Sequence, residues 1–143
     1  MEETRVLVVD DEREFLENVS KRLSNRGFLV DTALDGERAL GKIAGNIYDA
    51  IIMDLMMPGI DGLETLQRAL KKKKSLQIIL LTGQASIKTG VEAMRRGALD
   101  FMEKPADLNV LEQKIRDGKA RRQQLDEQGR EEAVIEALKK YGW

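Results

Sequence analysis

The sequence predicts an α/β fold in which helices cover both faces of a doubly wound, five-stranded parallel sheet. Five short apolar runs alternate along the chain with stretches in which apolar residues recur every three or four positions, the spacing of one helix face. Three of the apolar runs are continuous rather than alternating, which indicates strands that are buried on both sides. Helical crossovers between such strands are right-handed, and they lead to a doubly wound sheet.

The first half of the chain contains three predicted strands and two predicted helices. The strands are expected at 5–9, 28–33 and 50–53. A helix over 12–26 places its apolar residues on one face and is expected to end at Gly27, because glycine is common just beyond a helix. A shorter helix follows the turn at Asp35-Gly36 and ends near Gly45.

The second half continues the alternation of helix and strand. A loop with Pro58 and two glycines leads into a helix that carries an apolar stripe and is closed by the lysine run 71–74. The next helix is expected to be capped by Ser86 and to stop at Gly97, and the last to begin at Asp107. The two remaining strands are expected at 77–81 and 99–102.

The chain divides by composition into a domain, 1–118, and a charged extension, 119–143. We expect the extension to form one or two exposed helical pieces, because Gly118 and Gly129 interrupt its pattern. It is too short to enclose a second core.

The composition excludes several classes of function. The chain has no cysteine and no histidine, so disulfides, thiolate zinc sites, thiol nucleophiles and phosphohistidine are ruled out. Its 24 basic and 25 acidic residues nearly cancel, which does not favour nucleic-acid binding. No apolar run approaches the ~18 residues of a membrane span, and the acidic start is unlike a secretion signal. We therefore expect a cytoplasmic protein.

Carboxylates follow two of the predicted strands at the place where each strand ends. In a doubly wound sheet of order 2-1-3-4-5, ligands bind at the carboxyl ends of strands one and three. Asp10 and Asp11 end the first of these strands, and Asp54 surfaces at the end of the other. Three carboxylates that meet repel one another unless a hard cation binds there, and oxygen ligands favour Mg²⁺. Thr82 and Lys104 follow strands four and five and add groups suited to a phosphoryl ligand.

Four motifs, "VLVVDDE", "IIMDLMMPGIDG", "LLTG" and "DFMEKP", resemble the receiver domain of bacterial two-component response regulators, over about residues 4–118. The resemblance implies the flavodoxin-like (βα)5 fold and a phosphoryl group accepted on Asp54. It also implies that Asp11 and Asp54 bind Mg²⁺ directly, that Asp10 acts through water, and that the backbone carbonyl of Met56 adds a ligand.

The resemblance further implies how the phosphorylated state is held and read. Lys104 would pair with the phosphoryl oxygens, Thr82 would swing to bond them, and Phe101 would then move inward. Asp54 would thus act as phosphoacceptor in a protein that promotes its own phosphorylation and dephosphorylation and is otherwise not an enzyme. Met56 and Gln84 lie two residues beyond Asp54 and Thr82, positions that tune the lifetime of the phosphoryl group in this family.

The resemblance implies a sensor histidine kinase or phosphotransfer protein as donor, and a downstream protein as target. It allows a homodimer that depends on phosphorylation, and gives no reason to expect direct binding of nucleic acid or membrane. The chain would be a single-domain regulator or the N-terminal part of a larger one. Two alternatives stay open: a Mg²⁺-dependent phosphohydrolase with an aspartate nucleophile, and a degenerate receiver that binds proteins without phosphorylation. The first lacks the usual second aspartate, since Met56 stands in its place.

Overall fold

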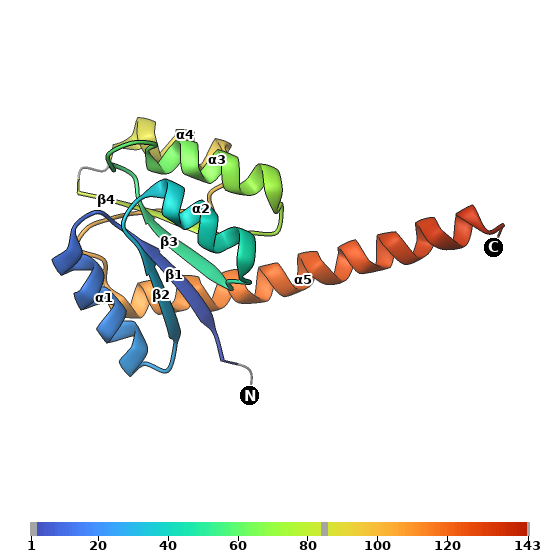
Figure 1. Ribbon diagram of the computed structural model, residues 1–143, viewed down its shortest axis with the longest axis horizontal. Coiled ribbons are helices and arrows are strands. Elements are labelled where there is room, and N and C mark those ends of the chain that lie inside the picture. Colours follow the sequence, from blue (N-terminus) through green and yellow to red (C-terminus); the bar gives the residue numbers. More distant parts are fainter. Residues whose placement is uncertain (1–2, 84–85, 143) are drawn as a thin grey trace.

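A computed structural model describes residues 3–83 and 86–142 and contains one five-stranded parallel sheet (Figure 1). The strands are β1 (Arg5–Val9), β2 (Leu29–Ala33), β3 (Ala50–Asp54), β4 (Ile78–Thr82) and β5 (Asp100–Glu103). Their order is β2-β1-β3-β4-β5 and every neighbouring pair is parallel, which confirms the predicted fold class. Strands β2, β4 and β5 each begin one residue later than the sequence predicts.

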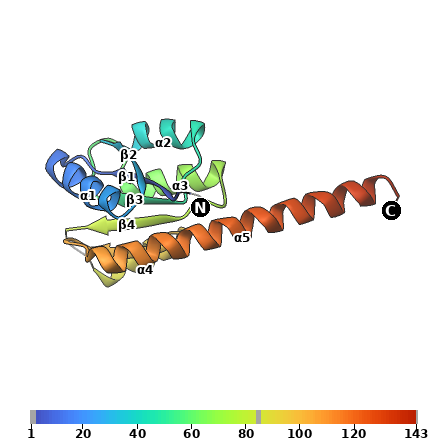
Figure 2. The same ribbon diagram turned by 90° about the horizontal axis from the view of Figure 1, so that it is seen from below.

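Helices cover both faces of the sheet. They are α1 (Arg13–Asn25), α2 (Gly36–Gly45), α3 (Gly62–Lys72), α4 (Ile87–Arg95) and α5 (Leu108–Lys140). Helices α1 and α5 lie on one face, and α2, α3 and α4 lie on the other, as Figures 1 and 2 show together. The sheet therefore separates two apolar clusters, one under each layer of helices.

Alternate residues of the central strands supply the two clusters. Leu7 and Ile51 point toward α2 and α3, whereas Val8 and Ile52 point toward α1 and α5. All four are at most 1% exposed. Burial on both faces explains why β1, β3 and β4 read as continuous apolar runs.

Side-chain caps fix where most of the helices begin. The carboxylates of Asp35, Asp61 and Asp107 accept backbone N–H bonds from the first turns of α2, α3 and α5. Ser86 caps α4 in the same way, as the sequence predicts, and accepts from the N–H of Thr89. Because α3 begins immediately beyond the loop that follows β3, its capped end lies beside the carboxyl end of that strand.

Helix α5 is one continuous helix that extends far beyond the sheet (Figures 1 and 2). Gly118 and Gly129 lie inside it and do not interrupt it. A β-carbon at Gly118 would lie 3.2 Å from side-chain atoms of Gln77 and Leu99, so glycine lets the helix approach the sheet closely. Within the described ranges, no helix is long and apolar enough to cross a membrane.

Candidate functional site at the carboxyl end of the sheet

The predicted site residues come together at the carboxyl ends of the parallel strands. Asp10 follows β1, Asp54 is the last residue of β3, and Thr82 is the last residue of β4. The backbone N–H of Lys104, just beyond β5, donates to the carbonyl of Thr82 at 2.8 Å. Four positions far apart in the sequence thus reach one edge because the strands run in the same direction.

The Asp54 side chain lines a cleft of about 360 Å³ at this edge. Thr82, Lys104 and Asp11 also line the cleft, as does Met56, which is 71% exposed. Asp54 itself is only 5% exposed, so it is buried at the end of its strand rather than surfacing there as expected. Gln84, the other residue expected to affect phosphoryl lifetime, lies outside the described residues.

Lys104 is the cation of the site. Its Nζ donates a hydrogen bond of 2.6 Å to Oδ2 of Asp10 and lies 3.6 Å from Oδ2 of Asp54. Burial by itself lowers the pKa of Lys104, but the hydrogen bond to Asp10 and the charges of Asp10, Asp54 and Glu12 outweigh it, so the pKa is raised. The ring of Phe15 lies 4.2 Å beneath the ammonium and adds a cation–π contact. Lys104 is therefore charged and held by two carboxylates.

Asp54 is held in an environment that opposes its ionisation. Burial raises the pKa of Asp54 above its ordinary value, and the negative charge of Asp10 raises it further. Lys104 and a 3.3 Å hydrogen bond from the N–H of Met56 act in the opposite direction without cancelling the effect. The Asp54 carboxylate therefore gains from any added positive charge in the cleft.

Three carboxylates lie close enough together to share a cation. One oxygen from each of Asp10, Glu12 and Asp54 lies within 4.8 Å of the others. Oxygen donors without nitrogen or sulfur suit a hard divalent ion such as Mg²⁺. Sequence reasoning gave Glu12 no ligand role, although it directly follows the acid pair. Asp11 lines the cleft and adds to the charge at Asp54, but it is not one of these three.

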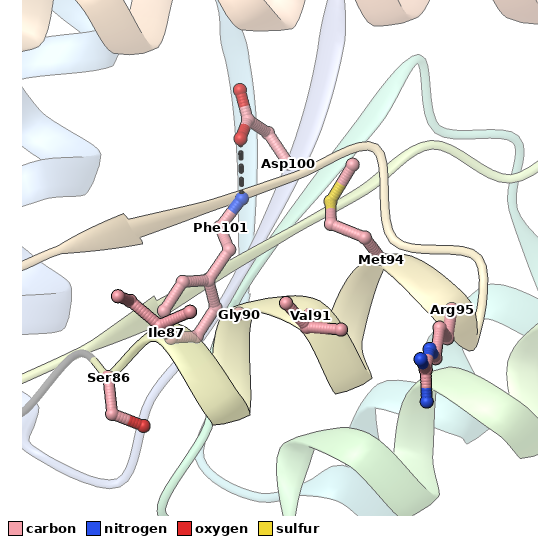
Figure 3. A pocket seen from close by; sticks show the side chains of 8 residues that line it. All are labelled: Ser86, Ile87, Gly90, Val91, Met94, Arg95, Asp100 and Phe101. Carbon is pink, nitrogen blue, oxygen red and sulfur yellow. Dashed lines mark hydrogen bonds between the residues drawn. The ribbon is translucent and has the colours of Figure 1, made fainter.

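Phe101, the predicted switch residue, lies on the far side of β5 from the α5 helix and reaches toward α4. Its ring lies against the first turns of α4, beside Ile87 and Gly90 (Figure 3). A β-carbon on Gly90 would lie 3.2 Å from the ring, so glycine leaves room for the phenyl group there. With Val91 and Met94, these residues line an open, mostly apolar cavity of about 810 Å³.

The sequence is similar to those of known response regulators. Response regulator MprA from Mycobacterium sp. strain KMS is 39% identical over 112 residues, which are 78% of this chain and 49% of the relative. The chain thus spans about half the length of the curated relatives that it matches.

The fold is also similar to solved structures of response regulator proteins. A response regulator receiver domain protein from Clostridium thermocellum matches with a TM-score of 0.81 and 29% identity, over 85% of this chain and 98% of the other. Response regulator protein TrrA from Thermotoga maritima, solved in complex with Mg(2+)-BeF, matches with a TM-score of 0.73 and 36% identity, over 80% of this chain and 98% of the other. The family model of the response regulator receiver domain matches residues 6–116, so the chain belongs to the receiver-domain family of two-component response regulators.

Proposed function

We propose that this chain is a cytoplasmic phosphoacceptor that receives a phosphoryl group on Asp54 and signals through a change in shape. One observation carries the proposal: a single lysine, Lys104, lies within 4 Å of both Asp54 and Asp10 at a cleft open to solvent. Such a site combines a carboxylate nucleophile with a cation that can bind the phosphoryl oxygens. The chain acts as a signalling component and is not proposed to turn over a separate substrate.

In the transfer itself, the carboxylate of Asp54 is the nucleophile. One of its oxygens attacks phosphorus and forms the new P–O bond. The bond from phosphorus to the donor, a histidine nitrogen of a sensor kinase or phosphotransfer protein, breaks, and the donor keeps the electron pair. Lys104 then exchanges part of its contact with Asp10 for the phosphoryl oxygens.

The carboxylates fit a magnesium ion. Asp10, Glu12 and Asp54 already present oxygens within 4.8 Å of one another, and Asp11 lines the same cleft. We propose that this group holds Mg²⁺, with the backbone carbonyl of Met56 as a further ligand. The bound ion supplies positive charge, which offsets repulsion between the carboxylates and the incoming phosphoryl group. TrrA, a relative in fold and sequence, was solved with Mg(2+)-BeF, which supports the assignment.

The readout is proposed to run from Thr82 to Phe101. Thr82 lines the cleft, and its neighbour across the sheet in β5 is Glu103, two residues from Phe101. If the Thr82 hydroxyl turns to the phosphoryl group, the Phe101 ring gains room to move inward from α4. The surface around α4 and β5 would then change for a downstream protein, or for a second copy in a phosphorylation-dependent homodimer.

The test is incubation with Mg²⁺ and acetyl phosphate followed by intact mass measurement. We expect one labile phosphate on the wild-type chain and none on Asp54→Asn, which keeps the shape of the side chain. The matched control, Asp117→Asn on the exposed face of α5, should gain phosphate like the wild type. An adduct that survives Asp54→Asn, or no adduct at any Mg²⁺ concentration, would contradict the proposal. Repeated turnover of several phosphoesters would favour a hydrolase.

A further inference from the structure

Gly90 lies inside α4, where glycine destabilises a helix relative to alanine. Its backbone N–H donates to the carbonyl of Ser86 at 3.0 Å, which is the hydrogen bond of a regular helical turn. Gly90 is not among the described glycines whose φ is positive, so its backbone conformation is one that any residue adopts. The backbone therefore gives no reason for a glycine at this position.

The ring of Phe101 gives the reason that the backbone does not. A β-carbon at position 90 would lie 3.2 Å from Cδ1, 3.6 Å from Cε1 and 3.9 Å from Cγ of that ring. Apart from the adjoining residues and the backbone of the helix, these are the three nearest atoms, and the closest would have to give way by a few tenths of an ångström. The space left by Gly90 is thus a seat for the Phe101 ring, here called the ring seat (Figure 3).

The backbone on both sides of the ring seat is held in place. On β5, the N–H of Phe101 donates to the carboxylate of Asp100 at 2.7 Å, and Lys114 of α5 pairs with the same carboxylate (Figure 3). On α4, Ser86 and Thr89 cap each other, because the side chain of each accepts from the backbone N–H of the other. The ring can therefore leave the seat by rotation about its own side-chain bonds, without a shift of either element.

A second position for the ring lies over β4. Phe101 stands opposite Leu80 in the sheet, and both belong to the apolar cluster under α2, α3 and α4. Side chains alternate along a strand, so Thr82, two residues after Leu80, points to the same side of the sheet. Rotation away from α4 thus brings the ring toward Thr82, and there it no longer contacts Gly90.

We propose that Gly90 sets the balance between these two positions of the Phe101 ring by seating the ring against α4 in the unphosphorylated chain. A side chain at position 90 crowds the ring only while it is seated, so it shifts the population toward the inward position. Gly90 is a positioning residue, since it contacts the ring and not the phosphoryl group. The inference rests on the proposed function, in which the inward ring belongs to the phosphorylated state.

Ring position and binding at Asp54 are then linked. A group that binds at Asp54 and favours the inward ring binds more tightly when less free energy is needed to empty the seat. Beryllofluoride with Mg²⁺ imitates a phosphoryl group on a carboxylate and serves as the probe. We expect Gly90→Ala to bind it about fivefold more tightly than the wild type does.

Fluorine NMR of the chain labelled with fluorophenylalanine observes the ring directly. The chain has three phenylalanines, Phe15, Phe28 and Phe101, and the three signals are assigned by replacing each in turn with leucine. Without a phosphodonor, Gly90→Ala should move the Phe101 signal toward its position in the wild-type chain saturated with beryllofluoride. Phe28, which is 4% exposed in the other apolar cluster, should not move. A Phe101 signal that stays in place, or moves the opposite way, overturns the proposal.

Titration with beryllofluoride in excess Mg²⁺ measures the linkage. Gly90→Ala should lower the midpoint about fivefold in the wild-type background and leave it unchanged beside Phe101→Ala, where no ring fills the seat. Gly41→Ala in α2 is the matched control and should leave the midpoint unchanged, because nothing lies within 4 Å of its β-carbon. An equal effect of Gly90→Ala with and without the ring would show that alanine acts through helix propensity, and overturns the proposal.

The wild-type chain separates this proposal from the one on which it rests. If it binds no beryllofluoride, phosphorylation at Asp54 is contradicted, and regulation by Gly90 is contradicted with it. If it binds, and Gly90→Ala neither moves the ring nor tightens binding, only the role of Gly90 is contradicted.

Discussion

Lys104 bonds Asp10 more closely than it approaches Asp54: its Nζ is 2.6 Å from Oδ2 of the first and 3.6 Å from Oδ2 of the second. The Asp10 side chain is 1% exposed, and its other oxygen accepts the backbone N–H of Glu12 at 2.8 Å. Lys104 thus stabilises the buried carboxylate of Asp10. The contact serves both the fold and the site.

Replacement of Lys104 by methionine should therefore destabilise the protein as well as slow phosphorylation. Breaking a buried pair leaves the Asp10 charge without its cation, and we expect the free energy of unfolding to fall by about 3 kcal/mol. Urea denaturation measures this free energy of unfolding. Lys88→Met, at an exposed lysine of α4, is the control and should change stability by less than about 0.5 kcal/mol. Equal stability of the Lys104→Met and wild-type chains would show that the pair adds nothing to the fold.

Asp54→Asn should stabilise the metal-free protein at neutral pH by about 1 kcal/mol. Burial, followed by the charge of Asp10, raises the pKa of Asp54 from its ordinary value of 3.8. Between the ordinary and the raised pKa, the folded chain binds a proton that the unfolded chain has released, so the free energy of unfolding falls as pH rises through that window. Asparagine does not titrate and avoids this cost.

Denaturation of both chains in EDTA at a series of pH values checks this expectation. The advantage of Asp54→Asn should grow as the pH rises from 3.8 through the raised pKa of Asp54, and it should shrink as the pH falls toward 3.8, where Asp54 is increasingly protonated in both states. An advantage that grows with acidity would mean that the pKa of Asp54 is lowered in the folded protein.

Met56→Ser should speed loss of the phosphoryl group from Asp54. Met56 lines the cleft and is 71% exposed, and we expect its bulky apolar side chain to restrict the approach of water to the phosphoryl group. We expect a severalfold shorter lifetime, measured as decay of the phosphorylated mass after removal of donor. Leu29→Ser, another exposed apolar position but one on β2 and outside the cleft, should leave the lifetime unchanged. An unchanged lifetime for Met56→Ser would show that water reaches phosphorus by another route.

Gly62→Ala should damage the site through the backbone. A β-carbon at Gly62, the first residue of α3, would lie 2.6 Å from the carbonyl oxygen of Asp54 and 2.8 Å from Cα of Leu55. Backbone atoms cannot step aside cheaply, so we expect a loss of about 2 to 3 kcal/mol and weak phosphorylation. Gly41→Ala in α2 has open space around it and should instead stabilise by about 0.5 to 1 kcal/mol. Thermal unfolding distinguishes the two, and a harmless Gly62→Ala would mean that α3 shifts freely.

The sequence predicts the meeting of Asp10, Asp54, Thr82 and Lys104 because parallel strands bring their carboxyl ends to one edge. It does not predict which carboxylate Lys104 bonds, since a flexible lysine can reach either from its loop. Membership of Glu12 in the carboxylate cluster likewise depends on how the chain turns after β1. The roles of these residues in phosphorylation stay predictions.

Helix α5 shows a second limit of prediction from the sequence. Gly118 reads in sequence as a place where a helix weakens. In the structure its missing side chain is what allows close packing on Gln77 and Leu99. The pairing of Arg122 with Asp49 joins positions 73 residues apart, and no local pattern indicates it.

Arg122→Met should loosen the outer part of α5 from the domain. Without Arg122, Asp49 loses its cation and keeps the bond from the backbone N–H of Arg5, so we expect a loss of about 3 kcal/mol. Backbone amides of 119–126 should exchange with deuterium faster, because the helix is no longer tied to the sheet at its base. Arg121→Met, at the neighbouring exposed position, should leave exchange and stability near the wild type. Unaltered exchange in Arg122→Met would mean that close packing at Gly118 alone holds the helix, and that the ion pair adds little to its anchoring.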